Sequence, residues 1–211
     1  MSIANEVAKI LLEIGCVQVK PKDPFTYASG LKGPIYCDNR KVLSHVKERN
    51  IIIDAFVKLI QEKNLEFDQL AGLATAGIPH AAFIASKLDL PMIYIRDKAK
   101  GHGKGNQVEG DFIPGQKVLL IEDLVNQGSS LEKAVQGAVD AGLNVVGCLS
   151  IVDYEMAKSR DILKKLNLDL FSLTNFSHLA DTACVLGKIG KDEVELLRAW
   201  QKDPAGWHES L

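Results

Sequence analysis

Two adjacent acidic residues end a strongly apolar run and stand just before a turn rich in glycine and serine. The apolar run covers residues 117–121, Glu122 and Asp123 follow it, and the turn at 126–130 opens a helical segment. Unpaired N–H groups at a helix start favour an anion, and Gly128 lets the backbone approach a phosphate closely. Carboxylates accept hydrogen bonds from hydroxyl groups. The pattern predicts a site for a phosphorylated sugar, with an ordinary capped helix preceded by solvated acids as the alternative interpretation.

Strand geometry limits how the two acids can act together. Successive residues of a strand point to opposite faces, so only one of Glu122 and Asp123 can face a ligand unless the strand has already ended. The turn is neither a Walker A loop nor a GxGxxG dinucleotide turn, because the required lysine and glycine spacings are absent. These two nucleotide-binding motifs are therefore excluded.

A second group of chemically active side chains lies in the polar, glycine-rich segment 96–110. Its potential cations are Arg96, Lys98, Lys100, His102 and Lys104. Lysine supplies a point charge and arginine a bidentate fork for phosphate oxygens, while histidine can donate a proton near neutral pH. The glycines allow the segment to close over a substrate and exclude water. A solvated charged loop is the alternative, but unstructured loops of this length are usually lids or binding loops.

The amino-terminal part of the chain must position these groups from one side. The first residues predict an amphipathic helix with Ser2 as its N-cap. Residues 16–43 hold short β-prone pieces broken by proline and glycine, which predicts a small irregular hood subdomain. Ser44 is the predicted cap of a long helix that continues to about Asn64, with Val46 among its inward residues.

From about residue 68 strand-like and helical segments alternate. The predicted strands are QLAGLAT, PMIYIR, KVLLIEDL, NVVGCLSIVD and LDLFSL, and the predicted helices are 78–88, 129–141 and 155–166. Nearly continuous apolar strands indicate a sheet with helices on both faces. The pattern predicts an α/β fold whose core, residues 68–173, is an open, mostly parallel β-sheet flanked by helices. Two short tail helices, against which Trp200 and Trp207 pack, complete a single domain of residues 1–211.

Composition narrows the class of function. Of the 211 residues 46% are hydrophobic and 25% are charged, which is typical of a globular protein and not of a disordered chain. The formal net charge of −2 argues against a dedicated binder of nucleic acid or of anionic membranes. Four scattered cysteines lack zinc-type spacing, and the amino terminus lacks a basic leader. With no apolar run long enough to span a bilayer, we expect a reduced, cytoplasmic protein.

Segment 117–135 resembles the phosphoribosyl-pyrophosphate signature of the type I phosphoribosyltransferases, in which an apolar strand precedes two acids and a Gly/Thr/Ser turn. Three further segments resemble the orotate-using branch of that family, and they occur in the same order. They are the base-site segment PFTYASGLKGPIYCDNR at 24–40, the strand–turn–helix GLATAGIPHAA at 72–82, and the mobile catalytic loop at 96–110. The resemblance covers most of the chain and implies the type I phosphoribosyltransferase fold.

The resemblance also implies a role for each matching residue. Lys100, His102 and Asp123 would be catalytic. The substrate-binding residues would be Tyr36, Cys37, Arg40, Thr75, Ala76, Arg96, Lys98, Glu122, Leu124, Val125, Asn126, Gln127, Gly128, Ser129, Ser130 and Tyr154. Among these, the acids would hold the ribose hydroxyls, the turn would hold the 5-phosphate, and residues 36–40 would hold the base.

The implied reaction transfers 5-phosphoribose from 5-phosphoribosyl 1-pyrophosphate to orotate, which gives orotidine 5′-monophosphate and pyrophosphate in pyrimidine biosynthesis. Mg²⁺ would bind mainly through the pyrophosphate, and a homodimer would share the loop 96–110 between its subunits. The chain departs from the best-known members at Ala28, Asn126 and Tyr154, which bears on the base more than on the donor. The alternatives are a phosphoribosyltransferase for another base and a non-catalytic, nucleotide-sensing regulator of the same fold.

Overall fold

The computed structural model of the protein describes residues 2–98 and 107–207. In this part of the chain the centre is a six-stranded sheet with the strand order β10-β9-β8-β5-β6-β7. The strands are β5 (Gln69–Leu73), β6 (Met92–Ile95), β7 (Val108–Glu109), β8 (Lys117–Val125), β9 (Asn144–Asp153) and β10 (Leu170–Asn175). All neighbours are parallel except β6 and β7, which are antiparallel. The predicted open, mostly parallel sheet is confirmed.

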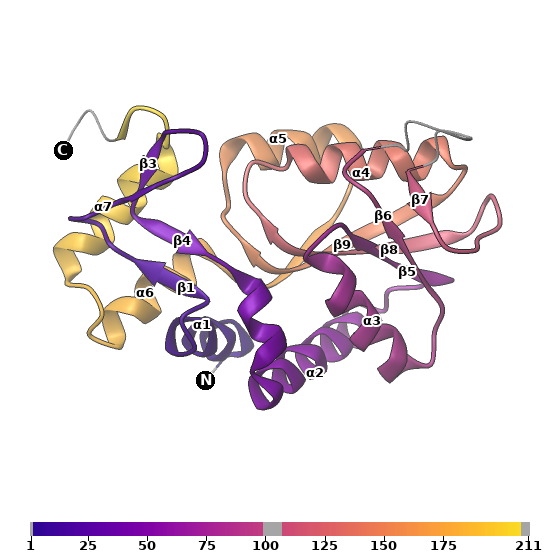
Figure 1. The fold of residues 1–211 in the computed structure, drawn as a ribbon, viewed down its shortest axis with the longest axis horizontal. Coiled ribbons are helices and arrows are strands. Elements are labelled where there is room, and N and C mark those ends of the chain that lie inside the picture. Colours follow the sequence, from indigo (N-terminus) through magenta and orange to yellow (C-terminus); the bar gives the residue numbers. More distant parts are fainter. Residues whose placement is uncertain (1, 99–106, 208–211) are drawn as a thin grey trace.

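Helices cover both faces of this sheet (Figure 1). The helices are α1 (Ile3–Glu13), α2 (Val46–Glu62), α3 (Gly77–Leu88), α4 (Ser129–Asp140), α5 (Ala157–Leu166), α6 (Phe176–Val185) and α7 (Lys191–Lys202). Residues of α2 and α3 share a core with Ile121, whereas residues of α4 and α5 share the opposite core with Leu120. Both strand faces must therefore be apolar, which explains the continuous apolar runs. Within the described residues, none of these helices combines the length and apolar character needed to cross a bilayer.

The amino-terminal segment forms two small antiparallel pairs beside the sheet. β1 (Val17–Val19) pairs with β4 (Ile35–Cys37), and β2 (Phe25–Thr26) pairs with β3 (Lys32–Gly33). Figure 1 shows them next to α6 and α7, at the far end of the molecule from β6 and β7. These short pairs occupy the segment for which the sequence predicts an irregular hood.

The start of the long helix differs from its prediction. Ser44 does not cap this helix but ends the 3₁₀ helix η1 (Asn39–Ser44), and His45 is the N-cap of α2. Val46 is 58% exposed and not inward, because it stands in the first turn, ahead of the buried residues that begin at Ile52. A 3₁₀ turn directly before an α-helix has no hydrophobic period of its own, so the sequence pattern does not separate the two.

The start of α3 lies directly against Ile121 and Glu122 in the middle of β8, and a glycine makes this contact possible. A Cβ atom added at Gly77 would overlap the carbonyl oxygen of Ile121 and would lie 3.3 Å from the Cα of Glu122. Any side chain at this position would push α3 away from the strand that carries the acidic residues. Gly77 therefore sets how closely the first turn of α3 approaches the acids.

Replacing Gly77 by alanine should destabilise the protein. We expect Gly77→Ala to lower the free energy of unfolding by about 2–3 kcal/mol, because the new methyl group must displace backbone. Gly147→Ala is the matched control, since its Cβ would meet its nearest neighbour, Leu119 Cδ1, at an ordinary 3.5 Å. Urea unfolding measures both variants, and equal midpoints for the two would contradict the packing argument.

Candidate active site

Two helices begin at the carboxyl edge of the sheet without side-chain caps. The N-cap residues are Ala76 for α3 and Gly128 for α4, and in the described part of the chain no side chain caps either start. Gly128 has a φ of +80°, and a Cβ atom there would lie 3.2 Å from the Cα of Ser159. Open N–H groups at a helix start, with the helix dipole behind them, attract an anion. Because β5 and β8 are neighbours in the sheet, both starts lie at the same edge.

One pocket, of about 220 Å³, surrounds the start of α4, and we call it the phosphate pocket. Its lining consists of Glu122, Leu124, Val125, Asn126, Gln127, Gly128, Ser129, Ser130 and Leu131. All the residues predicted for the phosphate turn are in this lining. Backbone N–H groups and serine hydroxyls are the hydrogen-bond donors that a phosphate ester requires. The structure thus brings the predicted turn together around a space of suitable chemistry.

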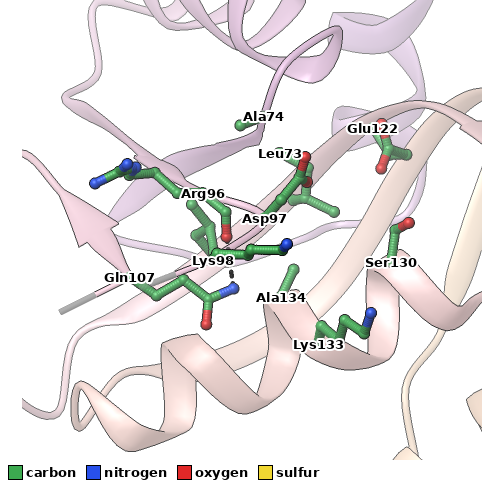
Figure 2. Close-up of a pocket in the computed structure, with 11 residues that line it drawn as sticks. Leu73, Ala74, Arg96, Asp97, Lys98, Gln107, Glu122, Ser130, Lys133 and Ala134 are labelled. Carbon is green, nitrogen blue, oxygen red and sulfur yellow. Dashed lines mark hydrogen bonds between the residues drawn. The ribbon is translucent and has the colours of Figure 1, made fainter. Parts of the chain in front are cut away.

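A second pocket, of about 260 Å³, adjoins the first, and we call it the cationic pocket. Its lining consists of Leu73, Ala74, Ile95, Arg96, Asp97, Lys98, Gln107, Glu122, Ser130, Lys133 and Ala134. Figure 2 shows the amino groups of Lys98 and Lys133 pointing into the same space, the first from the segment after β6 and the second from α4. Glu122 and Ser130 line both pockets and so mark the boundary between them.

The paired stem of segment 96–110 places Arg96 at the cationic pocket. The backbone N–H of Arg96 donates to the carbonyl of Gln107 at 2.9 Å, and Gln107 Nε2 donates to the carbonyl of Arg96 at 2.5 Å. Arg96 Nη1 also lies 3.4 Å from Glu109 Oε1. The Arg96–Gln107 pair continues the antiparallel pairing of β6 with β7. The sequence pattern did not predict β7. The predicted catalytic residues Lys100 and His102 lie outside the described residues.

The two acids are neighbours whose carboxyls interact, but only one of them lines the pockets. β8 continues to Val125, and Glu122 lines both pockets whereas Asp123 lines neither. The backbone N–H of Asp123 donates to Glu122 Oε1 at 2.9 Å, and its carbonyl accepts from Asn39 Nδ2 at 2.9 Å. The backbone of Asp123 therefore contacts the hood segment, and of the two acids only Glu122 lines the two pockets.

Glu122 is held in an environment that disfavours its charged form. Burial raises the pKa of the Glu122 carboxyl well above its usual range, and the negative charges of Asp123 and Asp97 raise it further. A ligand that brings positive charge to this point would reverse that effect. The site is thus electrostatically prepared for a cation or for a sugar that acquires positive character.

The residues predicted to hold the base lie on the hood side of the acids and outside both pockets. Tyr36 is exposed, and Cys37 beside it is half-buried. Burial raises the pKa of the Cys37 thiol, and the charge of Asp123 raises it further, which places this cysteine near that acid. Arg40 is exposed, with its Nε 2.6 Å from Oδ1 of Asp38. Cys37 and Arg40 therefore lie near Asp123, and the Arg40 guanidinium is paired with Asp38.

Three other predicted residues have no place in either pocket. Thr75 and Ala76 connect β5 to α3, but their predecessors Leu73 and Ala74 form the lining of the cationic pocket. Tyr154 is only 3% exposed, and its ring lies 5.7 Å from that of Phe176. The backbone of the β5–α3 turn thus stays beside the site, whereas the Tyr154 side chain belongs to the core.

Lys133 is a functional candidate that the sequence reasoning missed. It stands three residues after Ser130 in α4 and lines the cationic pocket with it. The spacing i, i+3 places both side chains on one helix face, so the sequence contained a signal. Without the structure, however, that face could not be assigned to a pocket. Asp97 also lines the pocket and was not predicted as a site residue.

The raised pKa of Glu122 generates a pH-dependent prediction. A carboxyl whose pKa is higher in the folded state stabilises the fold below its ordinary value of 4.5, and that stability is lost as the pH rises through the folded-state pKa. Glu122→Gln should therefore raise the melting temperature of the ligand-free protein at pH 8 by about 2–4 °C. The gain should vanish near pH 4.

Thermal melts at the two pH values measure this difference. Glu66→Gln is the control, because Glu66 is exposed and far along the chain from the acids, and it should change neither melt. An equal shift for Glu122→Gln at both pH values would contradict the electrostatic origin of the effect.

Comparisons with known proteins agree with this geometry. A family model described as "Phosphoribosyl transferase domain" matches residues 40–184. The orotate phosphoribosyltransferase of Listeria monocytogenes is 47% identical over 207 residues, which is 98% of this chain and 99% of the relative. The enzyme of the same name from Bacillus cereus is 47% identical over 201 residues, which is 95% and 96% of the two chains.

A solved structure has the same fold as this chain. The orotate phosphoribosyltransferase from Aeropyrum pernix superposes with a TM-score of 0.70 at 26% identity, covering 86% of this chain and 99% of that one. The matched family model and the relatives cover the sheet, both pockets and, in the relatives, the hood as well. The chain therefore belongs to the phosphoribosyltransferases and, among them, to the orotate phosphoribosyltransferase family.

Proposed function

We propose that this protein transfers the 5-phosphoribosyl group from 5-phosphoribosyl 1-pyrophosphate to orotate, forming orotidine 5′-monophosphate and pyrophosphate. One observation carries the proposal: two anion-suited pockets adjoin and share Glu122 and Ser130. A donor with a phosphate at one end of a ribose and a diphosphate at the other fits such a pair. Relatives at 47% identity over nearly the whole chain bear the name of this enzyme.

The donor would lie across the two pockets. Its 5-phosphate would accept hydrogen bonds from the N–H groups and serine hydroxyls of the turn 126–130. Its diphosphate would lie in the cationic pocket, against Arg96 and Lys98. The ribose would then lie at the shared boundary, where Glu122 can accept hydrogen bonds from its hydroxyls. Asp123 would accept hydrogen bonds from the hydroxyls of the same ribose on the hood side.

The acceptor would lie between the hood and the acids. Backbone groups of Tyr36 and Cys37 would hold the orotate ring, and Arg40 would pair with its carboxylate after exchanging Asp38 for the ligand. Asn126, which lines the phosphate pocket and is exposed, has an amide that can donate and accept hydrogen bonds. Asp123, near Cys37, would then face the bond between sugar and base.

Catalysis would consist of positioning and electrostatic stabilisation. The bond between the sugar carbon and the diphosphate oxygen breaks while a bond to the ring nitrogen of orotate forms, and the electron pair leaves with the diphosphate. Lys100 and His102 of the loop 96–110 would neutralise the departing charge, and the carboxylates would stabilise the positive character of the sugar. No covalent link between enzyme and substrate is required.

The loop would be donated by a partner subunit, so the protein would act as a homodimer with shared sites. Neither a nucleic acid nor a membrane has a part in this reaction, and both substrates are small anions. Biosynthesis of a nucleotide from such substrates would take place in the cytoplasm.

The family implies Mg²⁺, and the donor set of the cationic pocket fits this ion. Glu122 and Asp97 supply carboxylate oxygens, the ligands that hard divalent cations prefer. Burial raises the pKa of the Glu122 carboxyl, and the negative charges of Asp123 and Asp97, which a cation would compensate, raise it further. Among the described residues no group of three or more His, Cys, Asp or Glu could hold a metal, so diphosphate oxygens and water would provide most ligands. Bound Mg²⁺ would neutralise part of the diphosphate charge.

Release of pyrophosphate in the presence of different bases tests the proposed reaction. With Mg²⁺ and 5-phosphoribosyl 1-pyrophosphate, we expect orotate to support turnover, and hypoxanthine and uracil to support none. Asp123→Ala is the control for contaminating activity and should abolish the release. Turnover with another base would make this a phosphoribosyltransferase of different specificity, and no turnover with any base would favour the regulator.

Mixing two inactive variants tests the shared site. Lys100→Ala removes a loop cation, and Asp123→Ala removes an acid, so each homodimer should be inactive. If the loop crosses between subunits, a mixed dimer should regain about one intact site, since both lesions then fall in the other site. Activity after mixing measures this directly, and a mixture as inactive as its components would rule out the exchange of loops.

A further inference from the structure

Lys133 presents a positive charge to the cationic pocket from α4, and not from the segment 96–110 that supplies the other cations. It belongs to α4, whereas Arg96 and Lys98 follow β6. Figure 2 shows its side chain extending along α4 on the same side as Ser130, toward the space that Lys98 also enters. Helical side chains lean toward the amino terminus of their helix, so the amino group lies toward the uncapped first turn.

The neighbouring charges leave Lys133 available for a ligand. Glu132 is directed elsewhere, because its Oε1 accepts from Nζ of Lys165 in α5 at 2.9 Å. Arg96, in contrast, already has Glu109 as a partner at 3.4 Å. Within the described residues Lys133 takes part in no hydrogen bond or ion pair, although Glu122 and Asp97 line the same pocket. Its amino group is thus not held by a carboxylate among the described residues.

The helix that carries Lys133 is firmly held. Leu131, Ala134 and Val135, which flank it in α4, are buried in the core between α4 and the sheet. The backbone under the lysine therefore has a fixed place relative to Ser130 and the phosphate turn. Only the flexible side chain has to adjust to a ligand.

We propose that Lys133 is a diphosphate-binding residue contributed by the same subunit as the phosphate turn. The inference rests on the proposed function and adds to it a cation that does not depend on the loop 96–110. A group on a fixed helix contacts the diphosphate alike in the bound donor and in the free product. Its contribution should therefore appear in the binding of both, and not in the chemical step.

Binding of inorganic diphosphate tests this role apart from activity. In calorimetry with Mg²⁺ and inorganic diphosphate, Lys133→Ala should bind about 5- to 20-fold more weakly than the unmodified protein. Lys133→Arg, which keeps the charge, should recover most of the affinity. Lys164→Ala is the matched control, because Lys164 is an exposed lysine near the end of α5 and should bind as the unmodified protein does.

Steady-state kinetics separates binding from chemistry. For Lys133→Ala we expect the KM for 5-phosphoribosyl 1-pyrophosphate to rise about 5- to 20-fold, with kcat within about twofold and the KM for orotate unchanged. Unchanged diphosphate binding in Lys133→Ala, or a loss of kcat with the donor KM intact, would overturn the assignment. Weaker diphosphate binding in a protein that shows no turnover with orotate would support Lys133 while refuting the proposed reaction.

Discussion

The site depends on the close approach of the first turn of α3 to Ile121 and Glu122 of β8. The parallel register pairs Gly72 with Ile121, so β5 ends beside Ile121 and Glu122 of the longer β8, and the helices that follow both strands begin at one edge. Gly77 removes the side chain that would otherwise separate α3 from the carbonyl of Ile121. Two helix starts with open N–H groups thus converge on Glu122. Two partial positive charges at one place make an anion site without any basic residue.

The close approach of α3 to β8 also affects Glu122 and Asp123. Two consecutive carboxylates in a partly buried position repel each other, and desolvation disfavours the charge of the inner one, Glu122. In the ligand-free protein this is an unfavourable arrangement, offset by the packing of the sheet. It becomes favourable only when a ligand brings positive charge between the acids and the anion sites. The same geometry that destabilises the free carboxylate therefore selects for a substrate with anionic ends and a centre that can become cationic.

The hood is held in place by aromatic packing from the end of the chain. The ring of Trp200 in α7 lies 5.7 Å from Phe176, 6.0 Å from Tyr154 and 6.5 Å from Tyr27. Tyr27 in turn donates a hydrogen bond to the carbonyl of Ile35 at 2.6 Å, next to Tyr36. Trp200 therefore packs against aromatic rings of the hood, of α6 and of the residue that follows β9. Through this cluster the carboxyl-terminal helix supports the segment that would hold the acceptor.

Local patterns were sufficient to predict the α/β alternation, the parallel core and the turn 126–130, because hydrophobic period, glycine positions and acid spacing are properties of short stretches of the chain. Strand alternation, which is also local, predicted that only one of Glu122 and Asp123 can face a given ligand group unless the strand has already ended. The long-range packing was needed to place Glu122, and not Asp123, in the lining of both pockets and to bring Lys133 and Lys98 into the same pocket. It likewise decided that Tyr154 is buried and that β7 pairs with β6. These outcomes depend on which segments, distant in the chain, meet at the sheet edge, and no local pattern encodes that meeting.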